Sequence, residues 1–344
     1  MPKLGYNNEE GKLGLSYSKL QVLHSCPRLF QITQLNNHRR QIKNIIFAYG
    51  HAVGAGVQAL VAGKSLQRAV LEALSQYDAP DLWEVHKSGR SIDSVITAIT
   101  KFHQADLLNG WIVPQFRNHK GDVVSGIEFF YQINVDAETT YQGHIDAILY
   151  NPEENIFLVL ELKTTGRYKE ETYKNSQQTL GYSLIVDWIV DHSSGLLEIR
   201  DAAFAKANNK VLYLVFDIAQ ELWQPLPLLQ TSLAKADFLQ GLLLDCGYIK
   251  SQIEADYFVK NGDSCSKFNR PCELYNLCDQ RSLTKVKAAP SDDGQYVQEE
   301  PALILELGDL LQQQMNKVES DAYDSSDPIA IPNIVIHDDD DFSL

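Results

Sequence analysis

The sequence predicts an α/β protein in which helices flank a mixed central sheet and a helical insert lies toward the N-terminus. Apolar residues recur at helical spacing in several segments before residue 110. Continuous apolar, β-branched runs follow between residues 127 and 216, which is typical of strands buried on both faces. Helical spacing returns over residues 228–253, so helices precede and follow the sheet. At 344 residues the chain can bury a large core, as one large domain or two.

Four helices are expected before the sheet. The first covers residues 16–35 and places Leu20, Leu23, Leu29 and Phe30 on an apolar face. The same periodicity predicts helices over residues 51–62, 65–77 and 93–108. The helical insert that contains these three helices spans about residues 50–125.

The sheet is expected to begin with a strand over residues 127–135 and to continue with strands over residues 141–150, 156–163 and 211–216. A crossover helix over residues 171–190 connects the last two of these strands, which makes the sheet mixed.

One hairpin of this sheet concentrates charged residues. Residues 151–155 form a turn signal, so the hairpin can bring Asp146 beside Glu161 and Lys163, which share a strand face. Two carboxylates and an ammonium group on one face suit a divalent metal and an activated water. The alternative is a surface strand whose charged face is exposed to solvent. The apolar run of residues 157–160 favours a buried strand instead, where such charges need a partner or a metal.

Four short motifs follow one another along the chain. They are a Ser-x-Leu stretch with Cys-Pro in residues 16–32, Gly143-x-x-Asp146, Glu161-x-Lys163 and Gln178-x-x-x-Tyr182. This array resembles the PD-(D/E)XK nuclease superfamily in its RecB-like branch, over roughly residues 16–280. The resemblance implies a restriction-endonuclease-like core with a mixed central sheet.

The resemblance also implies metal-dependent hydrolysis of phosphodiester bonds. Asp146, Glu161 and the carbonyl group of Leu162 would hold one or two Mg²⁺ or Mn²⁺ ions. Lys163 would orient the attacking water or offset charge on the phosphate. Glu128, which opens the preceding strand, resembles an additional acid of some family members. The alternative for Glu128 is a surface acid on an edge strand.

Two residues of the following helix complete the predicted catalytic set. Gln178 and Tyr182 lie four apart on one helix face, where they would bind phosphate or sugar oxygens or position Lys163. Packing of the helix on the sheet would by itself also explain Tyr182. Arg167 and Lys174 are the nearby candidates for DNA binding, although each is equally explained as a solvated surface charge.

One position departs from the pattern of the RecB-like branch. Its members carry a metal-binding His in a G-x-x-x-H-x-x-x-E helix, and the matching positions here are Gly50, Gly54 and Gln58. His51 precedes Gly54 by three residues and faces roughly 60° around the helix. His51 is therefore a candidate substitute ligand, or it only caps the helix or lines the groove. We expect Gly54 to leave that position open.

Four of the five cysteines form a second candidate site. Cys265, Cys272 and Cys278 lie within fourteen residues, and Cys26 is far away in sequence. Clustered cysteines in a cytosolic protein favour a metal over disulfides. The set is similar to the 4Fe-4S ligands of AddB-type and CRISPR-associated RecB-like exonucleases. The x5 spacing matches theirs but the x6 spacing does not, so a four-thiolate Zn²⁺ site and unrelated structural thiols stay as alternatives.

Charge separates the end of the chain from the rest. Of the net charge of −15, residues 291–344 contribute −13, from fourteen acids and Lys317. The remaining near-neutral body can hold a local basic groove. We expect residues 1–290 to form the nuclease domain, and residues 291–344 to form an acidic, mostly disordered tail with a short amphipathic helix over residues 302–315.

The last residues suggest a protein partner. The end of the chain, IVIHDDDDFSL, resembles the acidic, Phe-bearing tip of bacterial and phage single-stranded-DNA-binding proteins. The tail would then contact a single-stranded-DNA-binding or recombination protein. The alternative is a segment that only increases solubility.

These features predict a metal-dependent DNA exonuclease of recombination, repair or replication in a phage or bacterial setting. The alternatives are a non-catalytic DNA-binding or scaffold protein that kept the fold, and a CRISPR adaptation nuclease, which shares every motif. No signal peptide or membrane-spanning apolar run occurs. We therefore expect a cytoplasmic location in a bacterial or phage-infected cell, without membrane contact.

Overall fold

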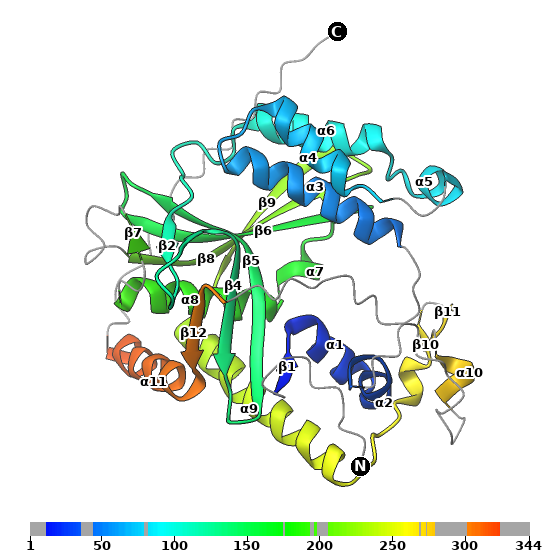
Figure 1. Cartoon of the computed structure of the whole chain (residues 1–344), viewed down its shortest axis with the longest axis vertical. Helices are drawn as coiled ribbons and strands as arrows, with labels where there is room; N and C mark the ends of the chain where they lie inside the picture. Colours follow the sequence, from blue (N-terminus) through cyan, green and yellow to red (C-terminus); the bar gives the residue numbers. More distant parts are fainter. Residues whose placement is uncertain are drawn as a thin grey trace.

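The computed structural model describes residues 12–35, 44–78, 82–174, 176–192, 196–197, 206–267, 270–272, 274–278 and 301–323. Its main element is a seven-stranded sheet made of β1 (Leu13–Leu15), β4 (Ile127–Asn134), β5 (Thr139–Asn151), β6 (Ile156–Thr165), β8 (Lys206–Asp217), β9 (Leu222–Leu229) and β12 (Leu303–Glu306). Helices cover both faces of this sheet (Figure 1). The predicted α/β class, with a mixed sheet between helices, is confirmed.

The sheet has the order β12-β4-β5-β6-β8-β9, and β1 pairs with β5 outside this path. β4, β5 and β6 are consecutive antiparallel strands, as the predicted hairpin requires. β6 and β8 are parallel and β8 and β9 antiparallel, so the sheet is mixed. β9 was not predicted, and its Pro225 and Pro227 would not fit a central strand. The structure accommodates both prolines because β9 lies at the edge of the sheet.

One face of the sheet is covered by the helical insert. Its elements are α3 (Ile45–Val61), α4 (Leu66–Gln76), α5 (Leu82–Ser88) and α6 (Ile92–Ala105). Asn44, Ser65 and Ser91 cap three of them through side-chain hydrogen bonds, which places the helix starts. The sequence did not predict α5 and began α3 six residues late. A small sheet of β2 (Gln115–Arg117), β3 (Val123–Ser125) and β7 (Leu196–Leu197) contacts β4 through β3.

The insert packs tightly onto the sheet. A Cβ atom on Gly56 would lie 2.4 Å from Cδ1 of Ile99, so α3 and α6 approach closely only because Gly56 has no side chain. Leu158, Leu160 and Leu214 face this layer and form its core with α3, α4 and α6. The residues that alternate with them on β6 must point to the other face.

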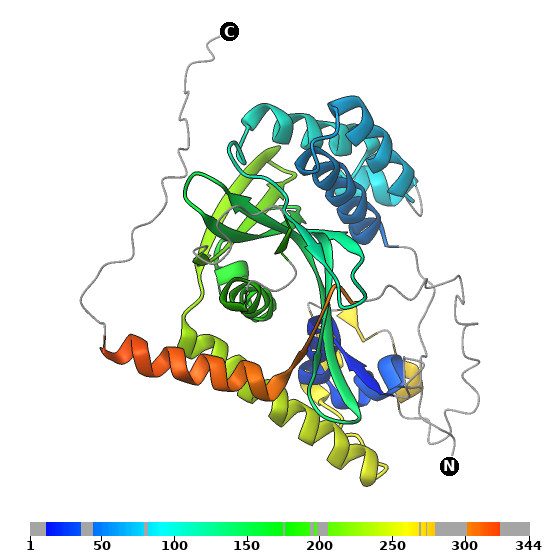
Figure 2. The ribbon, with the colours of Figure 1, turned by 60° about the vertical axis from the view of Figure 1, so that its left-hand side comes forward.

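The other face is covered by α7 (Glu171–Lys174), α8 (Gln178–His192), α9 (Ser232–Glu254) and α11 (Leu307–Tyr323) (Figure 2). The predicted helix over residues 171–190 is thus two helices, α7 and α8. α8 lies against the sheet and is buried on several sides. Its packing partners include Val159 of β6 and Leu239 of α9.

The first predicted helix, over residues 16–35, is also interrupted. The structure has α1 (Tyr17–Ser25), then an extended residue at Cys26, then α2 (Pro27–Phe30) and a π-helical turn over Gln31–Leu35. The residue before a proline avoids the helical region, which explains the break at Cys26. Pro27 in turn starts α2 at a position where its missing N–H costs nothing.

The predicted boundary of the acidic tail needs correction. Residues 303–306 form β12, which pairs in parallel with β4, and residues 307–323 form α11, which packs against α9 (Figure 2). Residues 301–323 therefore belong to the folded body, and the helix expected over residues 302–315 starts and ends later. The acidic tip at Asp338–Phe342 lies outside the described residues. Among the helices that are described, none has the length and apolarity needed to span a membrane.

Candidate active site

The candidate site lies where β5 and β6 stop pairing. Their antiparallel register ends at Ala147 and Leu160, while β6 continues its pairing with β8. One step further along that register sets Asp146 opposite Glu161, with both side chains on one face of the sheet. Oδ2 of Asp146 accepts a hydrogen bond from the backbone N–H of Leu162 at 2.6 Å. This hydrogen bond, formed where the two strands separate, therefore holds the carboxylate of Asp146 in place.

Glu161 is the buried centre of the site. Its side chain is 2% exposed, and its Oε1 lies 2.6 Å from Nζ of Lys163. Its second oxygen, Oε2, is buried without a hydrogen-bond partner among the described residues. A hydrogen bond between Glu161 and Asp146 would require one of the two carboxyl groups to carry a proton. An unpartnered buried carboxylate oxygen is costly, so this site has an acceptor that a cation would satisfy.

The electrostatics of the pair favour a cation as well. Burial raises the pKa of Asp146 well above its ordinary value, and the negative charge of Glu161 raises it further. Burial also raises the pKa of Glu161, although Lys163 opposes that shift. Burial lowers the pKa of Lys163, but attraction to Glu161 outweighs it and the net shift is upward. Lys163 is therefore a cation at neutral pH, while the two carboxylates repel one another.

Glu128 supplies a third acid to the same site. Its charge raises the pKa of both Asp146 and Glu161, so it lies within their electrostatic reach. Its φ of 49° is in the left-handed region and interrupts the regular course of β4. Nε2 of Gln58 on α3 donates a hydrogen bond of 2.5 Å to Oε1 of Glu128. The structure thus brings Glu128 to the predicted site, with its side chain held by the helical insert.

The same side of α3 carries the position that departs from the family pattern. A Cβ atom on Gly50 would lie 3.7 Å from Oγ1 of Thr164, so this side faces the end of β6. A Cβ atom on Gly54 would have no atom within 4 Å, which means open space at that position. His51 is exposed and lies seven residues before Gln58, on nearly the same side of the helix.

Gln178 and Tyr182 lie beside the carboxylates, at the start of α8. Nε2 of Gln178 donates a hydrogen bond of 2.6 Å to the hydroxyl group of Tyr182. Burial raises the pKa of Tyr182 well above its ordinary value, and the charges of Glu161 and Asp146 raise it further. Tyr182 therefore keeps its proton and sits in the field of both acids.

A tightly packed tyrosine explains the glycine of the motif. The hydroxyl group of Tyr131 lies 2.8 Å from where a Cβ atom of Gly143 would be, so a side chain there would clash. The ring of Tyr131 also packs edge-on against Tyr182, with centroids 6.1 Å apart. Gly143 thus allows the strand that carries Asp146 to lie close to the tyrosines under the site.

A groove of about 690 Å³ opens beside the site. Eight of its seventeen lining residues carry an aromatic ring: Tyr17, Phe47, Tyr131, Tyr141, His144, Tyr173, Tyr182 and Tyr213. Among the described residues, Lys163 is the one Lys or Arg in that lining. Arg167 is exposed and Lys174 pairs with Glu170 at 2.7 Å, and neither is part of the groove lining. The structure therefore does not bring the two predicted DNA-binding cations into this groove.

Sequence reasoning missed most of these aromatic residues. His144 stacks on Phe130 with ring centroids 4.6 Å apart and an interplanar angle of 12°. The signal for His144 was available, because it lies two residues before Asp146 on the same strand. Phe47, Tyr173 and Tyr213 come from three other elements, and no local pattern connects them to the motif.

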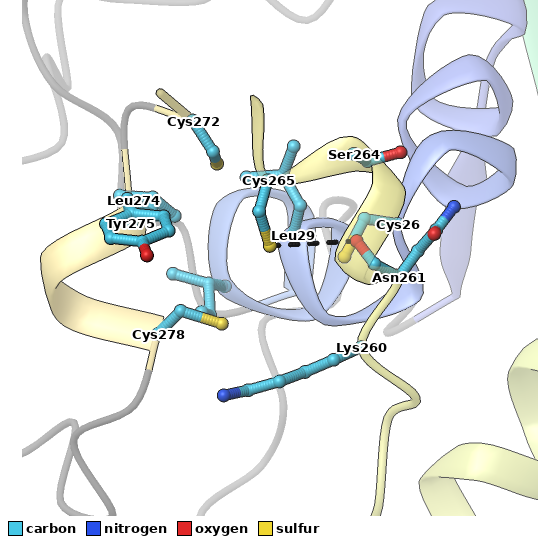
Figure 3. Close-up of a pocket in the computed structure, with 11 residues that line it drawn as sticks. Cys26, Leu29, Lys260, Asn261, Ser264, Cys265, Cys272, Leu274, Tyr275 and Cys278 are labelled. Atoms are coloured by element: carbon cyan, nitrogen blue, oxygen red, sulfur yellow. Dashed lines mark hydrogen bonds between the residues drawn. The ribbon is translucent and has the colours of Figure 1, made fainter. Parts of the chain in front are cut away.

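The four predicted cysteine ligands line a second, smaller cavity of about 60 Å³. Cys26 lies between α1 and α2, and the other three come from the segment with η3 (Gly262–Ser264), β10 (Ser266–Lys267), β11 (Arg270–Pro271) and α10 (Tyr275–Cys278). The four sulfur atoms point toward the same space (Figure 3). Cys246 lies elsewhere, buried in α9, where burial raises its pKa to about 12.

Backbone and side-chain hydrogen bonds hold the two ends of the chain together at this cavity. Nδ2 of Asn261 and Oγ of Ser264 donate to the carbonyl oxygen of Ser25 at 2.8 Å and 2.6 Å. The N–H of Arg28 donates to the carbonyl oxygen of Val259 at 3.1 Å. These bonds show that Cys26 and the C-terminal cysteines are brought together without a disulfide.

The two sites differ from a preformed metal centre in one respect. Across the part of the chain that the structure describes, no three His, Cys, Asp or Glu side chains converge closely enough to hold a metal ion. The donor types nevertheless fit: Asp146 and Glu161 supply carboxylate oxygens, one of them the unpartnered Oε2 of Glu161, and thiols line the small cavity. The thiol of Cys265 donates to the carbonyl oxygen of Asn261 at 3.7 Å (Figure 3). Metal binding at either site would require the donors to move closer together.

Comparison with known proteins agrees with the motifs. A sequence profile described as the PD-(D/E)XK nuclease superfamily matches residues 14–278, which include both candidate sites. No curated protein matches the chain at a significant level.

Proposed function

The chain belongs to the PD-(D/E)XK nuclease superfamily, and from this membership we propose that it is a metal-dependent deoxyribonuclease, and more specifically an exonuclease of DNA recombination, repair or replication. The main support is the buried pair of Asp146 and Glu161, with its unpartnered Oε2 next to Lys163. A structural role would not require two repelling carboxylates buried next to a groove-lining lysine.

We assign the metal site to Asp146, Glu161 and the carbonyl oxygen of Leu162, with Glu128 as a direct or water-mediated ligand. Hard oxygen donors of this kind suit Mg²⁺ or Mn²⁺. Such an ion, when bound, polarises a phosphate and lowers the pKa of its water. It would also offset the repulsion that raises the pKa values of Asp146 and Glu161.

Lys163 and Tyr182 act directly on the substrate in this proposal. The upward shift of its pKa keeps Lys163 charged, so it offsets negative charge on a phosphate and does not act as a base. Tyr182 keeps its proton, and Gln178 occupies an acceptor position of its hydroxyl oxygen. The hydroxyl hydrogen of Tyr182 is thereby directed to a phosphate or sugar oxygen.

The groove suggests how DNA reaches these residues. Phe47 is 66% exposed and His144 is also exposed, so these rings are accessible for stacking with bases, at about 1–3 kcal/mol per base. Among the described residues Lys163 is the one Lys or Arg in the lining, so the described part of the groove offers little for tracking the phosphates of a duplex. We therefore expect an unpaired strand to enter the groove, with the scissile phosphate at Lys163.

We assign Cys26, Cys265, Cys272 and Cys278 as ligands of a structural 4Fe-4S cluster, with Zn²⁺ as the alternative. The support is that thiols from both ends of the chain face one cavity. A shared metal there would close a long loop and stabilise the fold without taking part in the chemistry.

One experiment tests the proposed activity. End-labelled single- and double-stranded DNA is incubated with Mg²⁺ or Mn²⁺ and either wild type, Asp146→Asn or Lys163→Ala. Lys250→Ala is the matched control, because Lys250 pairs with Asp136 at 3.0 Å and lies outside the groove. We expect progressive shortening of single strands by wild type and the control, and shortening at least about a hundredfold slower by the other two. Equal DNA binding by all four proteins without cleavage would support the non-catalytic scaffold instead.

A further inference from the structure

The segment of residues 301–323 lies beyond residues 14–278, which match the nuclease superfamily, yet it is built into the fold. It consists of β12 at the edge of the central sheet and α11 across α9 (Figures 1 and 2). The first contact lies on β4, which carries Glu128, and the second lies on α9, which packs against α8.

β12 covers the edge of β4. Leu303 pairs with Tyr131 and Glu306 with Asn134, and the N–H of Ala302 donates to the carbonyl oxygen of Phe130 at 2.7 Å. Nδ2 of Asn134 also donates to Oε1 of Glu306 at 2.6 Å. In the described sheet β4 would be an edge strand without β12. Edge strands have one free row of backbone groups and are held less firmly.

β4 carries two groups of the site just before this contact. Glu128, with its left-handed φ, lies three residues before Tyr131. A left-handed backbone at a non-glycine residue persists only where the surrounding structure holds it. Tyr131 packs against Tyr182 and fills the space next to Gly143. The strand pairing that β12 supplies therefore stabilises the segment of β4 that positions Glu128 and Tyr131.

α11 contacts the helix that carries Gln178 and Tyr182. Nζ of Lys317 lies 2.6 Å from Asp191 and 3.7 Å from Asp187, both on α8. Nε2 of Gln313 donates to Oδ2 of Asp191 at 2.6 Å. Asp187 is buried and also pairs at 2.6 Å with Lys235 of α9, whose side chain is fully buried. This polar cluster ties α8, α9 and α11 together at a fixed orientation.

We propose that residues 301–323 are a C-terminal brace that positions Glu128 on β4 and the Gln178–Tyr182 pair on α8. Its consequence for catalysis rests on the function proposed above. The brace touches no substrate. It acts by adding strand pairing to β4 and ion pairs to α8. Buried apolar residues such as Leu305 and Leu310 dock it, and the ion pairs of Lys317 orient it.

The test uses the full chain with one substitution on the brace. Leu310→Ala removes a fully buried contact, and Met315→Ala, on the same helix but 45% exposed, is the control. We measure amide hydrogen exchange and Mn²⁺ binding by the spin resonance signal of free Mn²⁺, at a temperature where both variants are folded. For Leu310→Ala we expect at least tenfold faster exchange over residues 128–134 and at least threefold weaker Mn²⁺ binding. The control should match wild type.

Faster exchange confined to residues 301–323, with unchanged Mn²⁺ binding, would overturn the proposal and leave the segment as a passive cover. If Leu310→Ala does not fold, Leu305→Val is a milder change that is measured in the same way. The exchange pattern decides the proposal even if wild type proves unable to cleave DNA. In that case the proposed nuclease activity fails while the brace is judged on its own.

Discussion

The carboxylate site and the cysteine pocket are built in contrasting ways. Asp146, Glu161 and Lys163 come from two neighbouring strands, and strand register sets their relative positions. Cys26 and the other three cysteines come from opposite ends of the chain and meet through loops, a short hairpin and short helices. The sheet can therefore hold the repelling charges in place, although their repulsion destabilises the folded protein. The loops have few buried contacts of their own, so their positions depend on what the thiols bind.

Removing the charges of the carboxylate site distinguishes the two regions most clearly. Asp146→Asn keeps an oxygen for the N–H of Leu162 but removes one carboxylate, and Glu161→Gln removes the other. We expect each variant to lose about a hundredfold to a thousandfold in DNA cleavage while the fold is retained, since these residues serve chemistry and not packing. Cleavage rates and thermal unfolding are measured together. Full activity in either variant would contradict the site.

The second prediction removes the thiols one at a time. Cys26→Ser should abolish metal retention and lower the melting temperature by about 5 °C or more, because metal-binding energy there is folding energy. Elemental analysis and visible absorbance of anaerobically purified protein distinguish iron from zinc. Cys246→Ser is the control and should keep the metal, since Cys246 lies in the core of α9. If wild-type protein without metal unfolded at the same temperature as metal-bound wild type, the cysteine pocket would not depend on a metal. The contrast with the carboxylate site would then be wrong.

The third prediction concerns pH and applies only to the carboxylate site. Burial and mutual repulsion raise the pKa values of Asp146 and Glu161 in the folded state above their ordinary values of 3.8 and 4.5. The folded protein therefore binds more protons than the unfolded chain above those values, and stability falls as pH rises through the shifted range.

We expect this loss of stability in denaturant titrations with EDTA, and a flatter profile for the double variant Asp146→Asn/Glu161→Gln. Added Mg²⁺ should restore stability to wild type at neutral pH but not to the double variant. If the stability of wild type and of the double variant changed with pH in the same way, burial and repulsion of Asp146 and Glu161 would not destabilise the folded protein.

The smallest effect is expected at His51. Because His51 is exposed and Gly54 faces open space, we expect His51→Ala to change the Mn²⁺ concentration for half-maximal cleavage by less than about twofold. Gln58→Ala is the comparison, since Gln58 holds Glu128 and should have the larger effect. A tenfold rise for His51→Ala would identify His51 as the substitute ligand.

The parts of the structure that the sequence predicted depend on local patterns. The hairpin between β5 and β6 follows from alternation and a turn, and its two acids are close because the hairpin is short. β12 was missed because its four residues were predicted to begin the amphipathic helix over residues 302–315, and only pairing with β4 makes them a strand. The tyrosine groove was missed for a related reason. Tyr17, Tyr173 and Tyr213 share no sequence pattern and meet only through tertiary packing.

Tertiary packing also determines how the charged segments are arranged. Acidity at the end of the chain suggested one disordered tail, but buried leucines at positions 305, 307 and 310 anchor residues 301–323 to the body. The near-neutral charge of the body suggested a local basic groove, whereas Lys174 is paired with Glu170 and the described lining of the groove contains Lys163 and eight aromatic rings. Both the docking of residues 301–323 and the lining of the groove depend on where side chains point. Composition alone does not predict these directions.

The location of a bound metal tests the account most directly. Crystals of the protein soaked in Mn²⁺ and measured near the manganese absorption edge would show the ion as an anomalous difference peak. The account predicts a peak bounded by the carboxylates of Asp146 and Glu161 and the carbonyl oxygen of Leu162, and no such peak in the Glu161→Gln variant. A well-ordered site without a peak in the wild type, or a peak away from both carboxylates, would contradict it.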